Sequence, residues 1–192
     1  MKYGNKSALL RQFGDNMAQL VMKRPIGANP LGPMPPIPVR EAVASDDAEL
    51  ARLLAGAFPD YPWNIEKAHT DLLDAPDVPV TFVVEEGGKL IATASVREHP
   101  RFPESGYVHW VGVDPAHRGR RLGRVVMWHV MERRRAEGRT SSILETDDFR
   151  LPAITSYLGQ GFIPQYLDPD HAERWSKIFE VLAQSRYEAK GK

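Results

Sequence analysis

Arginines and glycines follow an apolar run in one short stretch of the chain. The stretch HWVGVDPAHRGRRLGR, residues 109–124, begins like a buried strand and continues into the expected start of a helix. A helix N-terminus carries about half a positive charge and several unpaired N–H donors, which together bind phosphate. Gly119 and Gly123 leave room for a ligand to touch the backbone. Four side chains beside them can donate paired hydrogen bonds to phosphate oxygens: Arg118, Arg120, Arg121 and Arg124.

The glycine spacing separates this turn from two common phosphate-binding motifs. The chain has no G-x-x-x-x-G-K-S/T sequence of nucleoside triphosphatases and no G-x-G-x-x-G sequence of dinucleotide-binding folds. The alternative interpretation is a solvated helix start whose arginines bind no ligand.

Length and composition predict one soluble globular domain with additions. The 192 residues are enough to bury a core, and 42% hydrophobic and 26% charged residues are typical of globular chains. No apolar run reaches the length of a membrane span, and the first thirty residues show no secretory signal. With no cysteine and no paired spacing among the six histidines, we expect neither a disulfide nor a metal site, and a cytoplasmic location without membrane association.

The net charge of zero hides a basic segment. Residues 117–139 contain eight arginines against two glutamates, a local balance of +6, which leaves −6 elsewhere. One alternative function is therefore nucleic-acid binding through an arginine-rich helix, which requires a contiguous basic face. The acidic balance elsewhere argues against a nucleic-acid partner. Arg133, Arg134 and Arg135 are also explained as cations stabilised at the C-terminal end of a long helix.

Hydrophobic periodicity predicts an α/β chain. Residues 47–58 and 119–136 carry apolar stripes at helical spacing, and the runs 80–86 and 89–98, joined by Gly87-Gly88, predict a β-hairpin. Further strands are expected at 38–42, 107–113, 141–147 and 161–167, and further helices at 64–74, 152–160 and around 175–182. This order is typical of a mixed sheet.

The two ends of the chain are expected to lie outside the central domain. Residues 5–24 place Leu10, Phe13, Met17, Leu20 and Val21 on one helical face, and six prolines between Pro25 and Pro38 predict an extended connector. The connector is either a strap packed on the domain or a recognition peptide. We divide the chain into an N-terminal helix and Pro-rich strap (1–37), a central domain (38–167), and a C-terminal helix and tail (168–192).

Two motifs give the chain a family resemblance. The segment V-G-V-D-P-A-H-R-G-R-R-L-G-R resembles motif A of the GNAT superfamily of acyl-CoA N-acyltransferases, Q/R-x-x-G-x-G/A, with Arg121 in place of the central glycine. A residue there can still offer its N–H if its side chain points away from the ligand. Ala153, Tyr157 and Gly161-Phe162 match the family's A-x-x-x-Y-x-x-x-G-F signature. The opening P-V-R-E-A-x-x-x-D-x-x-E-L is similar to the family's first strand and helix, so the resemblance covers about residues 38–166.

The resemblance implies a fold and a cosubstrate. The fold is a GNAT-type mixed, mostly antiparallel central sheet flanked by helices, with strands 4 and 5 splayed near residues 111–113 and 144–146. The cosubstrate is acetyl-CoA, and no metal is implied. Its pantetheine arm would pair with the backbone of Val111, Gly112 and Val113. Its pyrophosphate would be held by N–H groups of Arg118, Gly119, Arg120, Arg121, Leu122, Gly123 and Arg124. Arg150 stands where many family members have an asparagine near the cofactor.

The resemblance also implies direct attack of an amine on the thioester. Tyr157 is the predicted general acid that protonates the leaving thiolate; the alternative is a tyrosine that only packs against pantetheine. His109 is the predicted base, because related enzymes often place one there and imidazole titrates in the useful range. Strand alternation is expected to put Tyr107, His109 and Val111 on one face. The alternatives are that His109 is a structural histidine, or that the amine proton leaves through water.

The acyl acceptor is left open by these motifs. A small-molecule or peptide amine is expected, and segments 58–66 and 97–106 flank the acceptor opening by fold analogy. Glu145, Asp147 and Asp148 either attract a cationic substrate or solvate a loop.

Two further expectations concern the function class and the assembly. A second function class is an acyl-CoA-binding sensor without turnover. Trp110 and the terminal helices are candidates for a homodimer interface.

Overall fold

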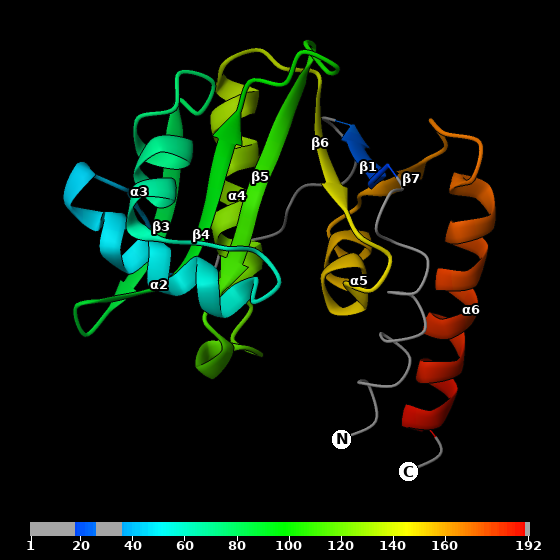
Figure 1. Ribbon diagram of the computed structural model, residues 1–192. Coiled ribbons are helices and arrows are strands. Elements are labelled where there is room, and N and C mark those ends of the chain that lie inside the picture. The colour runs from blue at the N-terminus through cyan, green and yellow to red at the C-terminus, as the bar shows by residue number, and fades with distance from the viewer. Residues whose placement is uncertain (1–17, 26–35, 191–192) are drawn as a thin grey trace. The chain divides into compact units, whose positions relative to one another are not determined.

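The computed structural model describes residues 18–25 and 36–190, with side chains up to residue 184. The chain divides into two compact units. One unit is Pro25–Ile143, and the other joins residues up to Arg24 with Leu144 and the residues that follow it. Figure 1 shows the elements of both.

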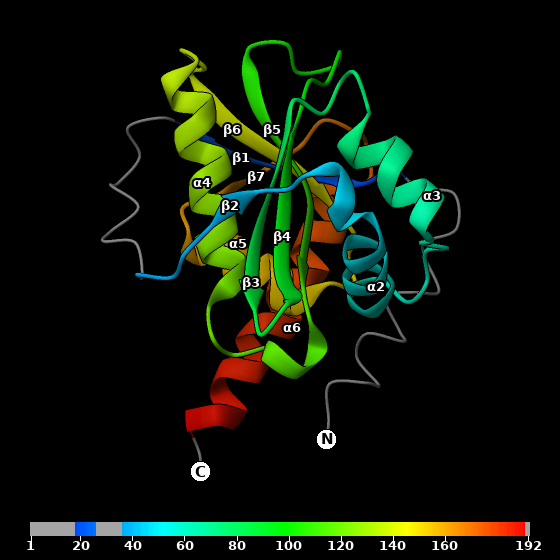
Figure 2. The ribbon, with the colours of Figure 1, turned by 90° about the vertical axis from the view of Figure 1, so that its left-hand side faces the viewer.

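The first unit is a sheet covered on both faces by helices. Strands β2 (Arg40–Glu41), β3 (Val80–Glu86), β4 (Lys89–Arg97) and β5 (Ser105–Val113) pair antiparallel in that order. Figure 2 shows α2 (Asp47–Ala57) and α3 (Ile65–Ala68) on one face and α4 (Leu122–Ala136) on the other. The short π-helical segment η2 (His69–Leu73) continues α3. The predicted hairpin is confirmed, and Gly87 and Gly88 both have positive φ, as its tight turn requires.

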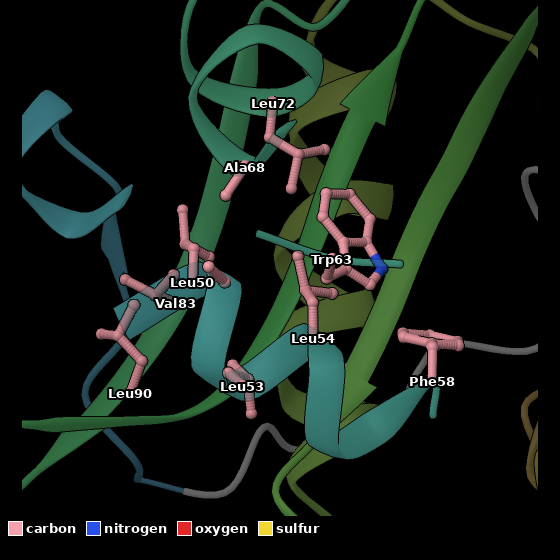
Figure 3. Close-up of a cluster of buried hydrophobic side chains, with 10 residues drawn as sticks. Leu50, Leu53, Leu54, Phe58, Trp63, Ala68, Leu72, Val83 and Leu90 are labelled. Carbon is pink, nitrogen blue, oxygen red and sulfur yellow. The ribbon is translucent and has the colours of Figure 1, made fainter. Parts of the chain in front are cut away.

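The hydrophobic stripe of α2 forms the core on its face of the sheet. Leu50, Leu53 and Leu54 are fully buried and pack with Ala68, Leu72, Val83 and Leu90, as Figure 3 shows. Burying one such leucine contributes about 2 kcal/mol. On the opposite face, α4 buries the predicted Leu122, Val125, Val126 and Val130. The two helices therefore fix β4 and β5 between them.

The second unit combines strands from both ends of the chain. It contains β1 (Leu20–Pro25), the end of β6 (Ser141–Thr146), α5 (Leu151–Gly159), β7 (Ile163–Gln165) and α6 (His171–Lys190). β1 pairs antiparallel with β7, Val21 opposite Gln165. The side chain of Arg24 is buried and donates to the Gln160 carbonyl (Nε···O 2.8 Å).

The helix predicted over residues 5–24 is wrong where the structure describes it, because Leu20–Pro25 is a strand. Leu20, Val21 and Met22 are all fully buried, so the strand is covered on both faces and shows no alternation. A short continuous apolar run of this kind cannot be told from a helix by periodicity. The rest of that helix, and most of the Pro-rich strap, lie outside the described residues.

Strand β6 joins the two sets of strands into one seven-stranded sheet, in the order β2-β3-β4-β5-β6-β1-β7. β5 and β6 pair parallel, with Ser105, Gly106 and Tyr107 opposite Ser141, Ser142 and Ile143. The predicted mixed, mostly antiparallel sheet flanked by helices is confirmed.

Candidate functional site

Strand β5 contains a bulge at Trp110. Thr93 of β4 lies opposite Gly112, and Ser95 lies opposite His109, so Ala94 faces two residues, Trp110 and Val111. Trp110 has φ 43°, a left-handed conformation that is strained for a side chain of this size. Such strain concentrates at functional sites.

The bulge changes which side chains share a face. The rings of Tyr107 and His109 lie 5.7 Å apart, and those of His109 and Trp110 lie 5.4 Å apart. Val111 faces α4 instead: its Cγ1 lies 3.8 Å from where a side-chain carbon at Gly123 would stand. The prediction that Val111 shares a face with His109 is therefore wrong, because one inserted residue reverses the alternation that follows it.

The turn after β5 is anchored to helix α2. Asp114 caps the short helix η3 (Pro115–His117) by accepting from the Ala116 N–H (2.9 Å). Arg52 of α2 forms an ion pair with Asp114 (Nη1···Oδ2 2.9 Å) and donates to the Leu90 carbonyl (2.7 Å). The Arg52 guanidinium holds the pKa of Asp114 below its usual value.

The predicted anion-binding turn leads directly into α4. Gly119 has φ 83°, and nothing lies within 4 Å of where its side-chain carbon would stand. Arg121, the N-cap of α4, has φ 61° and caps no N–H with its side chain. The Arg124 N–H donates to the Arg121 carbonyl (3.0 Å), so the N–H groups that depend on solvent or a ligand are those of Leu122 and Gly123. Arg121 stands where the family pattern has a glycine, and its backbone has the left-handed conformation that glycine adopts freely.

The arginines of this turn differ in how they are paired. Arg120 forms an ion pair with Glu86 (Nη2···Oε2 2.7 Å), which lowers the pKa of Glu86. Arg118 and Arg121 are exposed, and neither forms an ion pair with any residue that the structure describes. Two cationic side chains thus stand beside the open N-terminus of α4, an arrangement that suits a phosphate group.

Tyr157 lies on α5 in the second unit. It is buried, and burial raises its pKa to about 12, while the charge of Arg150 acts in the opposite direction. Gly161 has φ 84°, and the Phe162 N–H donates to the Tyr157 carbonyl (3.0 Å). The G-F pair of the signature therefore ends the helix that carries Tyr157.

The acidic residues predicted near the acceptor are engaged within their own unit. Asp147 accepts from Arg150 (Nε···Oδ2 2.7 Å), and Asp148 is buried against Arg174 (Nε···Oδ2 3.1 Å). These pairs argue against a role for Asp147 and Asp148 in attracting a cationic substrate, and Asp148 is buried in an ion pair instead of solvating a loop. The pair with Asp147 directs the guanidinium of Arg150 toward that carboxylate.

His109 lies beside a second charged pair. Its Nε2 is 3.5 Å from Nη1 of Arg97, which in turn forms an ion pair with Asp77 (2.7 Å). Burial lowers the pKa of His109 to about 3, and the Arg97 charge acts in the same direction. The imidazole is therefore neutral at pH 7.

A model of the acetyltransferase (GNAT) family matches residues 48–162, more than half of the chain. The chain belongs to the GNAT acetyltransferase family. The match includes the β5 bulge, the arginine turn and Tyr157, and it confirms the resemblance carried by the two motifs.

Curated relatives carry several different names. A mycothiol acetyltransferase of Thermomonospora curvata is 29% identical over 161 residues, covering 78% of this chain and 52% of the relative. N-acetyltransferase 8B of Rattus norvegicus is 28% identical over 113 residues, covering 53% of this chain and 51% of the relative. The chain thus spans about half the length of the curated relatives it matches.

Solved structures share the fold. A Trypanosoma brucei acetyltransferase has a TM-score of 0.55 at 24% identity, covering 68% of this chain and 95% of that one. A ribosomal-protein-alanine N-acetyltransferase from Brucella melitensis has a TM-score of 0.59 at 15% identity, covering 69% and 96%.

The described part of the chain contains neither a membrane-spanning helix nor a cluster of metal ligands. Over residues 18–25 and 36–190, no helix combines the length and hydrophobicity needed to cross a bilayer. Across the same ranges, no three His, Asp or Glu side chains gather as a metal site requires.

Replacing Arg121 by glycine is expected to stabilise the protein. Glycine adopts a left-handed conformation freely, so Arg121→Gly should raise the free energy of unfolding by about 1 kcal/mol, measured by urea denaturation. Arg120→Gly is the matched control: Arg120 has no positive φ and loses its ion pair with Glu86, so this variant should be less stable than the wild type. If Arg121→Gly and Arg120→Gly were equally stable, the interpretation that the left-handed backbone of Arg121 is strained would be contradicted.

The low pKa of His109 predicts a pH dependence of stability. Because folding lowers this pKa from 6.5 to about 3, the unfolded chain binds the proton more tightly, so stability falls as the pH drops from 6.5 toward 3. His109→Gln should flatten the decline measured by urea denaturation between about pH 6.5 and 4.5, where one such group contributes up to about 1.4 kcal/mol per pH unit. A variant whose stability declines as steeply as that of the wild type would show that His109 titrates normally.

Proposed function

We propose that the protein is an acetyl-CoA-dependent N-acetyltransferase with its catalytic domain at residues 38–167. The observation that carries the proposal is the backbone of the motif-A region. Trp110 and Arg121 are the non-glycine residues with positive φ in the described part of the chain, and both lie in this region. Both strained residues fall in the segments that the family resemblance assigns to the cosubstrate, which supports the proposal.

The residues present fit the phosphate end of coenzyme A. The open backbone at Gly119 and the N-terminus of α4 suit a pyrophosphate, together with the side chains of Arg118 and Arg121, which form no ion pair with the described residues. The backbone of Val111, Gly112 and Val113 is assigned to the pantetheine arm. Bound there, acetyl-CoA supplies the activated acyl group.

Tyr157 is proposed as the general acid. Its raised pKa of about 12 keeps the phenol protonated throughout the neutral range, so a proton is available for the departing thiolate. Arg150, held by Asp147, keeps a positive charge near the start of α5.

The group that accepts the amine proton can be judged by comparing the pKa of the substrate ammonium with that of His109. An alkylammonium has a pKa near 10, and transferring its proton to an imidazole of pKa about 3 is unfavourable by about seven orders of magnitude. This supports the route in which the amine proton leaves through water, with His109 as a neutral neighbour of the reacting groups.

The acceptor is proposed as a primary amine on a small molecule or peptide. One relative's name specifies mycothiol and that of N-acetyltransferase 8B specifies no acceptor, so the names support no single one. A nucleic-acid partner is disfavoured, since Arg133 pairs with Glu137 (2.6 Å) and Arg135 with Glu132 (2.7 Å), while Arg134 is buried. A cytoplasmic location and a homodimer stay predictions.

Isothermal titration with acetyl-CoA, CoA and ADP tests the cosubstrate, and thiol release with a panel of primary amines tests turnover. We expect saturable binding of both coenzyme forms and thiol release with at least one amine. Binding without release across the panel would favour the sensor alternative. If neither coenzyme form binds, the proposal is wrong.

Replacing Tyr157 by phenylalanine separates binding from chemistry. Tyr157→Phe should leave the Kd for acetyl-CoA within about twofold and lower kcat about 10²- to 10⁴-fold, because only the donated proton is removed. Tyr166→Phe, at a tyrosine that is 60% exposed, is the control. A kcat unchanged by Tyr157→Phe would leave Tyr157 with a packing role alone.

A further inference from the structure

Four aromatic side chains from two segments pack around the bulge in β5. They form what we call the aromatic cluster: Phe58, Tyr61, Trp63 and Trp110. The Trp110 ring lies at the centre, with its centroid 5.0 Å from Phe58, 4.8 Å from Tyr61 and 4.8 Å from Trp63. Aromatic rings attract one another at these separations.

The segment that carries the other three rings is fixed to the core. Phe58 and Trp63 are 9% and 8% exposed and belong to the same buried group as the leucines of α2, where Figure 3 shows them. Tyr61, in contrast, is 38% exposed, and Nζ of Lys67 lies 5.1 Å from its ring centroid. The cluster thus has a fixed inner part and an outer part open to solvent.

Trp110 has a backbone conformation that its own side chain disfavours. With φ 43° in a bulged strand, it persists only where surrounding contacts hold it. Its ring packs against the buried group around α2, and its ring–ring contacts are with the aromatic cluster and with His109. These rings are therefore the restraint that keeps the bulge in place.

The next residue along the chain is Val111, whose side chain turns toward α4. We propose that Trp110 is a positioning residue: its packing in the aromatic cluster holds the bulge so that the backbone of Val111 meets the acyl thioester. Segment 58–63, which carries the other rings of the cluster, is then a determinant of acyl-group binding. This inference rests on the proposed function. In the proposed function, the phosphate end of coenzyme A is held separately, by residues 118–124. The contribution of the acyl group to the binding affinity can therefore be measured apart from that of the phosphates.

Trp110→Gly tests the role of the ring, because glycine permits the backbone conformation but removes the restraint. Titration calorimetry should show the affinity for acetyl-CoA falling about tenfold relative to that for CoA. Trp110→Phe, which keeps a ring in the cluster, should restore the wild-type ratio. Equal changes for both ligands, or none, would overturn the proposal.

Tyr61→Ala tests the same coupling from a partly exposed residue of segment 58–63. It should lower the acetyl-CoA to CoA affinity ratio in the same direction as Trp110→Gly, while Tyr166→Ala, at another exposed tyrosine, leaves it unchanged. A wild-type ratio in Tyr61→Ala would refute a role for segment 58–63. Failure of the wild-type protein to bind either ligand would instead refute the proposed function.

Discussion

The positive backbone angles of Trp110 and Arg121 are the constraint around which the first unit is organised. A backbone that must offer N–H groups to a ligand cannot use them in a regular strand or helix, so it bends where a bulge or a helix start leaves them open. Glycine would bend there at no steric cost, yet this chain uses tryptophan and arginine. Each therefore needs a compensating contact, from the chain or from a ligand.

The backbone strain at Trp110 and that at Arg121 are compensated by different contacts. Trp110 is held from within the protein by rings of the segment that follows α2. Arg121 is exposed and has no ion-pair partner among the described residues, so the pyrophosphate of the proposed cosubstrate is the contact that would compensate it. Arg52 links the two regions, because it holds α2 to the start of the turn through Asp114. Helix α2 thus restrains the site although it contributes none of the predicted site residues.

The sequence predicted most elements of the sheet and the turn before α4, because these depend on local patterns. Leu50, Leu53 and Leu54 have helical spacing, and Gly87-Gly88 demands a tight turn. It failed at Leu20–Pro25, where burial on both faces removes the alternation that distinguishes a strand. It also failed at Val111, because a bulge is set by pairing with β4 and not by the residues of β5 alone. The aromatic cluster was not predicted as a unit, since Trp110 and Phe58 lie far apart in the chain.

The most direct test of the account is a titration of the isotopically labelled protein with acetyl-CoA, followed through its backbone amide chemical shifts. The largest changes are expected at the amides of the β5 bulge, Val111 and its neighbours, and at those of residues 119–124. Saturable binding with the largest changes elsewhere in the chain, and none in these two segments, would contradict that expectation.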